Sequence, residues 1–217
     1  MSVAADRIHG FYAICDLLPD AGPSEAALLA GLLLDGGAPI LQLRMKRGAG
    51  AAMLACAEAL RAVCAARGAL FVVNDRLDVA LACGADGVHL GQDDLPLAAA
   101  RRIAPPGFLI GISTHDENQI DAALAAGADY LGFGPCFPTT TKDNPDPVVG
   151  LLRLAEAVGR AHEHRVPLVA IGGITLARVP DVVTAGADAA AVISAVLTAP
   201  DIRAAARTVS AAFARLP

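Results

Sequence analysis

The chain of 217 residues is long enough to enclose one sizeable hydrophobic core, and no stretch of it has the composition of a linker. Its content of 55% hydrophobic and 18% charged residues suits helices packed over buried parallel strands. A formal net charge of −5 argues against nucleic acid or an anionic membrane as the main partner. We therefore expect a single domain over residues 1–217.

Targeting signals and paired cysteines are not evident. The apolar run 26–34 is too short to span a bilayer and lacks the basic flank of a signal peptide. The five cysteines form no C-x-x-C pair, which predicts reduced thiols and a cytoplasmic location. Cys136 has no evident histidine partner, so a small apolar role is favoured for it. A homo-oligomer is left open.

Four Gly-Ala turns divide the chain at nearly regular intervals. They begin at Gly37, Gly84, Gly127 and Gly186, with separations of 47, 43 and 59 residues. A period in the forties has room for two strand–helix units, so each turn should enter every second strand. Eight strands alternating with helices predict an α/β fold, the (β/α)8 TIM barrel, with an open doubly wound sheet as the alternative. The expected strands are 11–15, 40–44, 70–73, 87–91, 109–112, 130–134, 168–171 and 189–194.

The second of these strands carries polar groups in alternation with apolar ones. Gln42, Arg44 and Lys46 share one face of the strand, and Leu43 and Met45 lie on the other. If the apolar face packs against helices, an amide and two cations point into the mouth of the barrel. In an acidic protein this indicates an anionic ligand, and solvated charges at a strand end are the alternative.

Two acidic turns follow the third and fourth strands. Asn74-Asp75 precedes a short helix that Gly84 should end, and Gln92-Asp93-Asp94 follows the next apolar run. Carboxylates on one rim of the barrel suit a hard cation such as Mg²⁺. Each turn taken alone is also explained by helix capping, so both interpretations stay open.

Further polar groups follow the remaining strands. Ser113 falls on the rim and can donate to a phosphate or cap the helix that starts near Asp116. His115 is expected to be structural because no carboxylate partner is evident, and His89 is either a core residue or part of a pocket. The fifth, seventh and eighth strands thus contribute to one rim, where Gly173 and the pair Ile193-Ser194 suit a phosphate.

The long spacing between the third and fourth Gly-Ala turns contains an insertion. It covers residues 135–147 and includes Thr139, Thr140, Thr141 and Lys142. Long loops at this rim of a barrel carry function, so we expect a mobile lid, and a merely tolerated insertion is the alternative.

The motifs QLRMK, NDR, GVHLGQDD, GIST, GPCFPTTTK, IGGI and VIS occur in this order. Together they strongly resemble the thiamine phosphate synthase family, from about Tyr12 to the final helix. The resemblance implies a barrel enzyme, a transferase that joins hydroxymethylpyrimidine diphosphate to thiazole phosphate and releases pyrophosphate. It implies Mg²⁺ on Asp75 and Asp94. The motif residues implied to bind the two substrates are Gln42, Leu43, Arg44, Met45, Lys46, Asn74, Ser113, Thr139, Thr140, Thr141, Lys142, Gly173, Ile193 and Ser194.

The implied reaction needs no protein nucleophile, because loss of pyrophosphate can leave a stabilised pyrimidinylmethyl cation. Lys142, Ser113, Arg44 and Lys46 are then the expected catalytic residues, which stabilise the departing charge. The family usually has Glu where this chain has Met45. Strand alternation places this position on the face that points away from the barrel interior. The alternatives are a protein like the related thiazole tautomerases and a non-catalytic barrel that binds a metabolite. Both would have less need of the two aspartates.

Overall fold

The computed structural model describes residues 5–139 and 146–214. In these ranges eight parallel strands form a closed barrel, in which each strand pairs with the next and β8 pairs with β1. The (β/α)8 prediction is therefore confirmed, and the open sheet is excluded by the β1–β8 pairing. The strands are β1 (Gly10–Asp16), β2 (Ile40–Arg44), β3 (Leu70–Asn74), β4 (Gly87–Leu90), β5 (Leu109–Thr114), β6 (Tyr130–Phe133), β7 (Leu168–Ile171) and β8 (Ala189–Val192).

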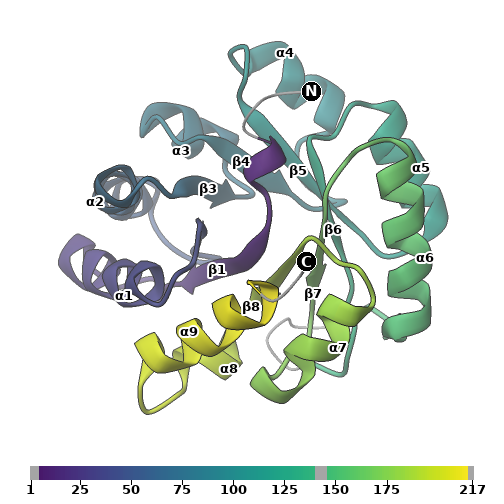
Figure 1. Ribbon diagram of the computed structural model, residues 1–217. Coiled ribbons are helices and arrows are strands. Elements are labelled where there is room, and N and C mark those ends of the chain that lie inside the picture. The colour runs from purple at the N-terminus through teal and green to yellow at the C-terminus, as the bar shows by residue number, and fades with distance from the viewer. Residues whose placement is uncertain (1–4, 140–145, 215–217) are drawn as a thin grey trace.

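Helices alternate with the strands and surround the barrel (Figure 1). In the described part of the chain, none of them combines the length and apolarity needed to cross a membrane. The helices are α1 (Pro23–Asp35), α2 (Gly50–Arg67), α3 (Leu77–Ala82), α4 (Leu97–Ile103), α5 (Glu117–Ala125), α6 (Gly150–Glu163), α7 (Val179–Thr184), α8 (Ser194–Leu197) and α9 (Ile202–Phe213), with 3-10 turns η1 (Ala5–Arg7) and η2 (Leu176–Arg178).

The Gly-Ala-Asp turns have a physical reason for their recurrence. Each glycine has a positive φ, as at Gly84 (+67°) and Gly186 (+90°), a conformation that ends the preceding helix without strain. The aspartate carboxylate then accepts a hydrogen bond from a backbone N–H of the preceding strand, each at 2.8 Å. These three aspartates are Asp86, Asp129 and Asp188, and they bond to Phe71, Ile110 and Leu168. The repeat therefore marks the amino-end rim of the barrel.

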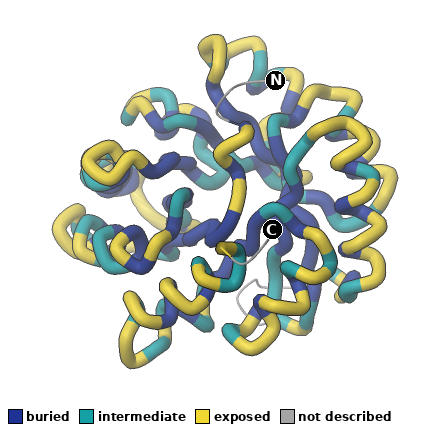
Figure 2. Tube along the Cα trace, viewed as in Figure 1, coloured by how far each residue is buried: buried dark blue, intermediate teal, exposed yellow. Residues whose placement is uncertain are grey.

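Two hydrophobic layers lie on the two faces of the strands. The outer layer, between strands and helices, contains Leu41, Leu43 and Met45, as the alternation of side chains along the strand predicts. The inner layer contains Tyr12 and Tyr130. Figure 2 shows the same division, because the central strands are buried while the outer faces of the helices are exposed.

Candidate active site

A cavity of about 800 Å³ opens where the carboxyl ends of the strands meet, within the usual size range of ligand sites. It collects residues from nearly every strand and the turn that follows it. The predicted residues of the first half of the chain that line it are Gln42, Arg44, Lys46, Asn74, Asp75 and Asp94. Those of the second half are Ser113, Thr139, Gly173, Ile193 and Ser194.

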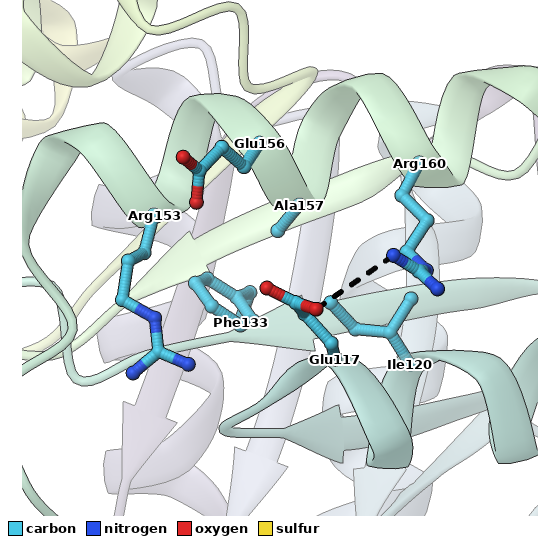
Figure 3. A pocket seen from close by; sticks show the side chains of 7 residues that line it. All are labelled: Glu117, Ile120, Phe133, Arg153, Glu156, Ala157 and Arg160. Carbon is cyan, nitrogen blue, oxygen red and sulfur yellow. Dashed lines mark ion pairs between the residues drawn. The ribbon is translucent and has the colours of Figure 1, made fainter.

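A smaller cavity of about 270 Å³ lies on the outside of the barrel between α5 and α6 (Figure 3). Glu117 on α5 faces Arg160 on α6, with which it pairs at 3.9 Å. Such exposed ion pairs are ordinary features of neighbouring helices. We therefore place the candidate active site in the large cavity at the carboxyl ends of the strands.

Arg44 ends β2 and Lys46 lies two residues beyond it; both reach the cavity, and each is held by a carboxylate. Arg44 Nη1 donates to both oxygens of Asp16, at 2.6 and 2.7 Å. Lys46 Nζ lies 2.6 Å from Asp75 Oδ2, with about half of the lysine side chain exposed. These pairs fix the positions of both positive groups at the rim. An anionic ligand could exchange with either carboxylate at a modest cost because the pairs are partly solvated.

The two acidic turns meet at one side of the cavity. Asp75 adopts a positive φ of +62°, which is uncommon for a residue other than glycine. Asp94 Oδ2 accepts a hydrogen bond from the backbone N–H of Gly91 at 2.7 Å. Burial raises the pKa of Asp94, and the neighbouring Asp75 raises it further. The described residues contain no cluster of three or more histidine, cysteine, aspartate or glutamate side chains arranged for a metal.

Ser113 and His89 lie deeper in the cavity and contact each other. His89 Nε2 is 2.9 Å from Ser113 Oγ, and His89 Nδ1 is 3.1 Å from the hydroxyl of Tyr130. Ser113 is therefore not a helix cap; Asp116 caps α5 by accepting from the Gln119 N–H at 2.9 Å. Burial lowers the pKa of His89 to about 4, so its ring is neutral at pH 7. Both interpretations of His89 hold, because it is hydrogen-bonded and lines the cavity.

The opposite side of the cavity is built from β7 and the segment after β6. Gly172 and Gly173 have φ values of +91° and +65°. A Cβ at Gly173 would lie 2.6 Å from the carbonyl oxygen of Phe137, so a larger residue would displace that segment. The backbone N–H of Phe137 donates to the Gly172 carbonyl at 3.0 Å. This contact brings Thr139 to the cavity wall beside Gly173.

Some predicted residues do not reach the cavity, and others cannot be placed. Leu43 and Met45 are buried in the outer hydrophobic layer, so their assignment to substrate binding is wrong at the level of their side chains. Strand alternation is the reason, since it turns them away from Gln42 and Arg44. Thr140, Thr141 and Lys142 lie outside the described residues.

Sequence reasoning also missed several groups that line or support the site. Tyr12 and Tyr130 face each other across the barrel, with their hydroxyls 2.9 Å apart. His115 does have a carboxylate partner, because Asp146 Oδ2 lies 3.4 Å from its Nε2. The expectation that His115 lacks such a partner, which was the reason for assigning it a structural role, is therefore wrong. Asp16 is the last residue of β1. A search for acidic residues at the ends of strands, which identified Asp75, would therefore have identified Asp16 as well.

Comparisons with known proteins agree with this geometry. A sequence model of the family described as thiamine monophosphate synthase matches residues 11–196. The chain belongs to this family. A thiamine-phosphate synthase of Methanoculleus marisnigri is 53% identical over 180 residues, covering 83% of this chain and 84% of its own. One of Myxococcus xanthus is 44% identical over 215 residues, covering 97% of this chain and 96% of its own. The family places the chain among the transferases of thiamine biosynthesis.

Solved structures support the same assignment. A thiamine phosphate pyrophosphorylase from Pyrococcus furiosus superimposes with a TM-score of 0.84 at 34% identity, covering 97% of this chain and 98% of that one. A 3-hexulose-6-phosphate synthase superimposes with a TM-score of 0.68 at 22% identity, covering 94% of this chain and 99% of that one. The second likeness shows only that the barrel fold is shared.

Proposed function

We propose that this chain joins hydroxymethylpyrimidine diphosphate to thiazole phosphate and releases pyrophosphate. The observation that carries the proposal is that one cavity holds two separate sets of groups suited to phosphates. Arg44, Lys46 and Ser113 form the first set, next to the two aspartates, and Gly173 and Ser194 belong to the second. A cavity of about 800 Å³ has room for both substrates together.

The bond that breaks joins the pyrimidinylmethyl carbon to the diphosphate oxygen, and both electrons leave with pyrophosphate. The resulting cation is then attacked by the thiazole nitrogen, so no protein nucleophile takes part. Cys136 is unsuited to that role in any case, since burial raises the pKa of its thiol to about 12. The protein's contribution is to hold the two substrates in line and to stabilise the leaving group.

Asp75 and Asp94 are proposed to hold Mg²⁺. Their oxygens suit a hard cation, and both carboxylates line the same cavity. When bound, the ion would neutralise part of the charge that develops on pyrophosphate. Arg44 and Lys46 then supply the remaining positive charge next to it. Lys46 can turn from Asp75 to a phosphate oxygen, because it is only half covered.

The segment from Thr139 to Lys142 is proposed to complete the site over the substrates. Thr139 already lies on the wall beside Gly173. The roles of Thr140, Thr141 and Lys142 rest on their place in the family motif alone, and their action as a lid stays a prediction. A cytoplasmic location is also a proposal, supported by the five cysteines, which all are free thiols.

A thiazole tautomerase-like activity and simple metabolite binding are the competing functions. Release of pyrophosphate distinguishes them, measured with both substrates, with each alone, and with Mg²⁺ removed by a chelator. The proposal expects release only when both substrates and Mg²⁺ are present. Conversion of the thiazole without the pyrimidine substrate would support the tautomerase, and binding without any release would support the metabolite binder.

A further inference from the structure

A continuous chain of hydrogen bonds crosses the floor of the cavity. Gln42 Nε2 donates to the Tyr12 hydroxyl at 3.0 Å, and this hydroxyl lies 2.9 Å from that of Tyr130. Tyr130 is 3.1 Å from His89 Nδ1, and His89 Nε2 is 2.9 Å from Ser113 Oγ. The chain thus connects two residues that line the cavity from opposite sides of the floor, Gln42 and Ser113.

Two glycines leave the space that the rings of this chain occupy. A Cβ at Gly111 would overlap the ring of Tyr130, and one at Gly132 would lie 3.1 Å from Cε1 of His89. The ring centroids of His89 and Tyr130 are 5.4 Å apart. Because β5 and β6 each give up a side chain to seat these rings, the positions of both are fixed by the strands rather than by flexible loops.

The direction of the hydrogen bonds follows from counting protons. Within residues 5–139 and 146–214, the Tyr12 hydroxyl bonds only to Gln42 and Tyr130. Gln42 donates to it, so the proton of Tyr12 has one acceptor, the oxygen of Tyr130. The opposite direction would leave this buried proton without a partner, which costs roughly 1–3 kcal/mol. Burial raises the pKa of both tyrosines, so both hydroxyls keep their protons.

The same direction continues to the other end of the chain. Tyr130 accepts a hydrogen bond from Tyr12 and donates one to His89 Nδ1. A neutral histidine that accepts at Nδ1 carries its proton on Nε2, and this N–H donates to Ser113 Oγ. In the described residues the Ser113 hydroxyl has no other partner, so its proton is free to donate into the cavity. At the opposite end, one of the two N–H groups of the Gln42 amide donates to Tyr12.

We infer that Tyr12 and Tyr130 are positioning residues that fix the polarity of one ligand contact, with Ser113 as a hydrogen-bond donor to the ligand. The inference deepens the proposed function, on which it rests for the identity of the ligand. A donor at Ser113 suits a phosphate oxygen. Without the Tyr130 hydroxyl, His89 can take the other tautomer and accept a hydrogen bond from Ser113, whose hydroxyl then no longer donates to the ligand.

The tautomer of His89 tests the inference without any substrate. Nitrogen chemical shifts of ¹⁵N-histidine-labelled protein at pH 7, assigned with His89→Gln, should show the proton on Nε2. In Tyr130→Phe a population with the proton on Nδ1 should appear. Thr114→Val is the matched control, because it removes a buried hydroxyl beside Ser113 that bonds to the Gly132 carbonyl outside the chain of hydrogen bonds. It should leave the His89 signals unchanged.

Binding of inorganic pyrophosphate with Mg²⁺, measured by calorimetry, tests the consequence. Tyr130→Phe should weaken binding about fivefold, the scale of one net hydrogen bond, and Thr114→Val should not. In a Ser113→Ala background, Tyr130→Phe should have no further effect, since its influence passes through Ser113.

A wild-type His89 with its proton on Nδ1 would overturn the inference, even if Tyr130→Phe failed to fold. So would equal pyrophosphate affinity in wild type and Tyr130→Phe, or an additive loss in the double variant. Failure of the proposed function would give a different result: His89 would have the expected tautomer, but the protein would not join the two substrates.

Discussion

Replacing Asp94 by asparagine should separate metal binding from folding. The asparagine oxygen can keep the hydrogen bond from the Gly91 N–H, which is 2.7 Å long in the native protein. What the variant loses is one negative charge beside Asp75. If this charge exists to hold Mg²⁺, its removal should harm activity while relieving a strain on the folded state.

The sign of the stability change follows from the pKa of Asp94. Burial raises it above the ordinary value of 3.8, and Asp75 adds to this, so the native state prefers the protonated form. Ionisation at higher pH therefore costs native stability, and this cost is absent in asparagine. Because Asp94 is partly exposed and solvent screens its charge, the expected gain is a small rise in Tm. The gain should be smallest near pH 3.5, where the carboxyl is mostly protonated in both states, and larger at pH 7.

Thermal unfolding with a chelator present, at both pH values, measures this gain. The Mg²⁺-dependent rate of pyrophosphate release should fall by about two to three powers of ten, the scale of losing one preorganised electrostatic group. Asp78→Asn serves as the control, because it also removes one carboxylate but from a surface pair with Arg76. Normal turnover by Asp94→Asn, or a loss of stability at pH 7, would refute the reasoning.

Three further predictions concern other parts of the site. Leu43→Asp should lower the free energy of unfolding by several kcal/mol, because it buries an unpaired charge in the outer layer. Gln42→Ala should lower it by about 1 kcal/mol and weaken substrate binding. Equal melting temperatures of the two variants would disprove the assigned facing of β2. Lys142→Ala should lower kcat by about two to three powers of ten with KM little changed, and steady-state kinetics showing a loss confined to KM would leave the lid without support. Burial lowers the pKa of His89 from 6.5 to about 4, so on acidification the unfolded chain takes up this proton before the folded protein does. The free energy of unfolding should therefore fall by up to about 3 kcal/mol between pH 6.5 and 4. Urea unfolding should show a weaker acid dependence in His89→Gln.

Much of the fold could be predicted because its signals are local. The glycine of each Gly-Ala-Asp turn is needed for a positive φ, and each aspartate bonds to the strand just before it. Both requirements act within about 20 residues, so they leave a regular mark in the sequence. The inward facing of Gln42, Arg44 and Lys46 was likewise readable from alternation along one strand.

The missed parts of the site depend on closure of the barrel. Tyr12 and Tyr130 are 118 positions apart and meet only because β1 and β6 face the same interior. Their signal was present but faint, since they are the only two tyrosines in the chain and both lie in predicted strands. The pairing of His115 with Asp146 depends on the path of a long loop, which no local pattern specifies.

Direct detection of the joined product tests the central claim most directly. Wild-type protein, Mg²⁺ and equal amounts of hydroxymethylpyrimidine diphosphate and thiazole phosphate should be incubated and quenched over time, with both products measured by mass spectrometry. The account predicts thiamine phosphate and pyrophosphate in equal amounts at every time point. Pyrophosphate without thiamine phosphate, or no product from a folded protein, would contradict it.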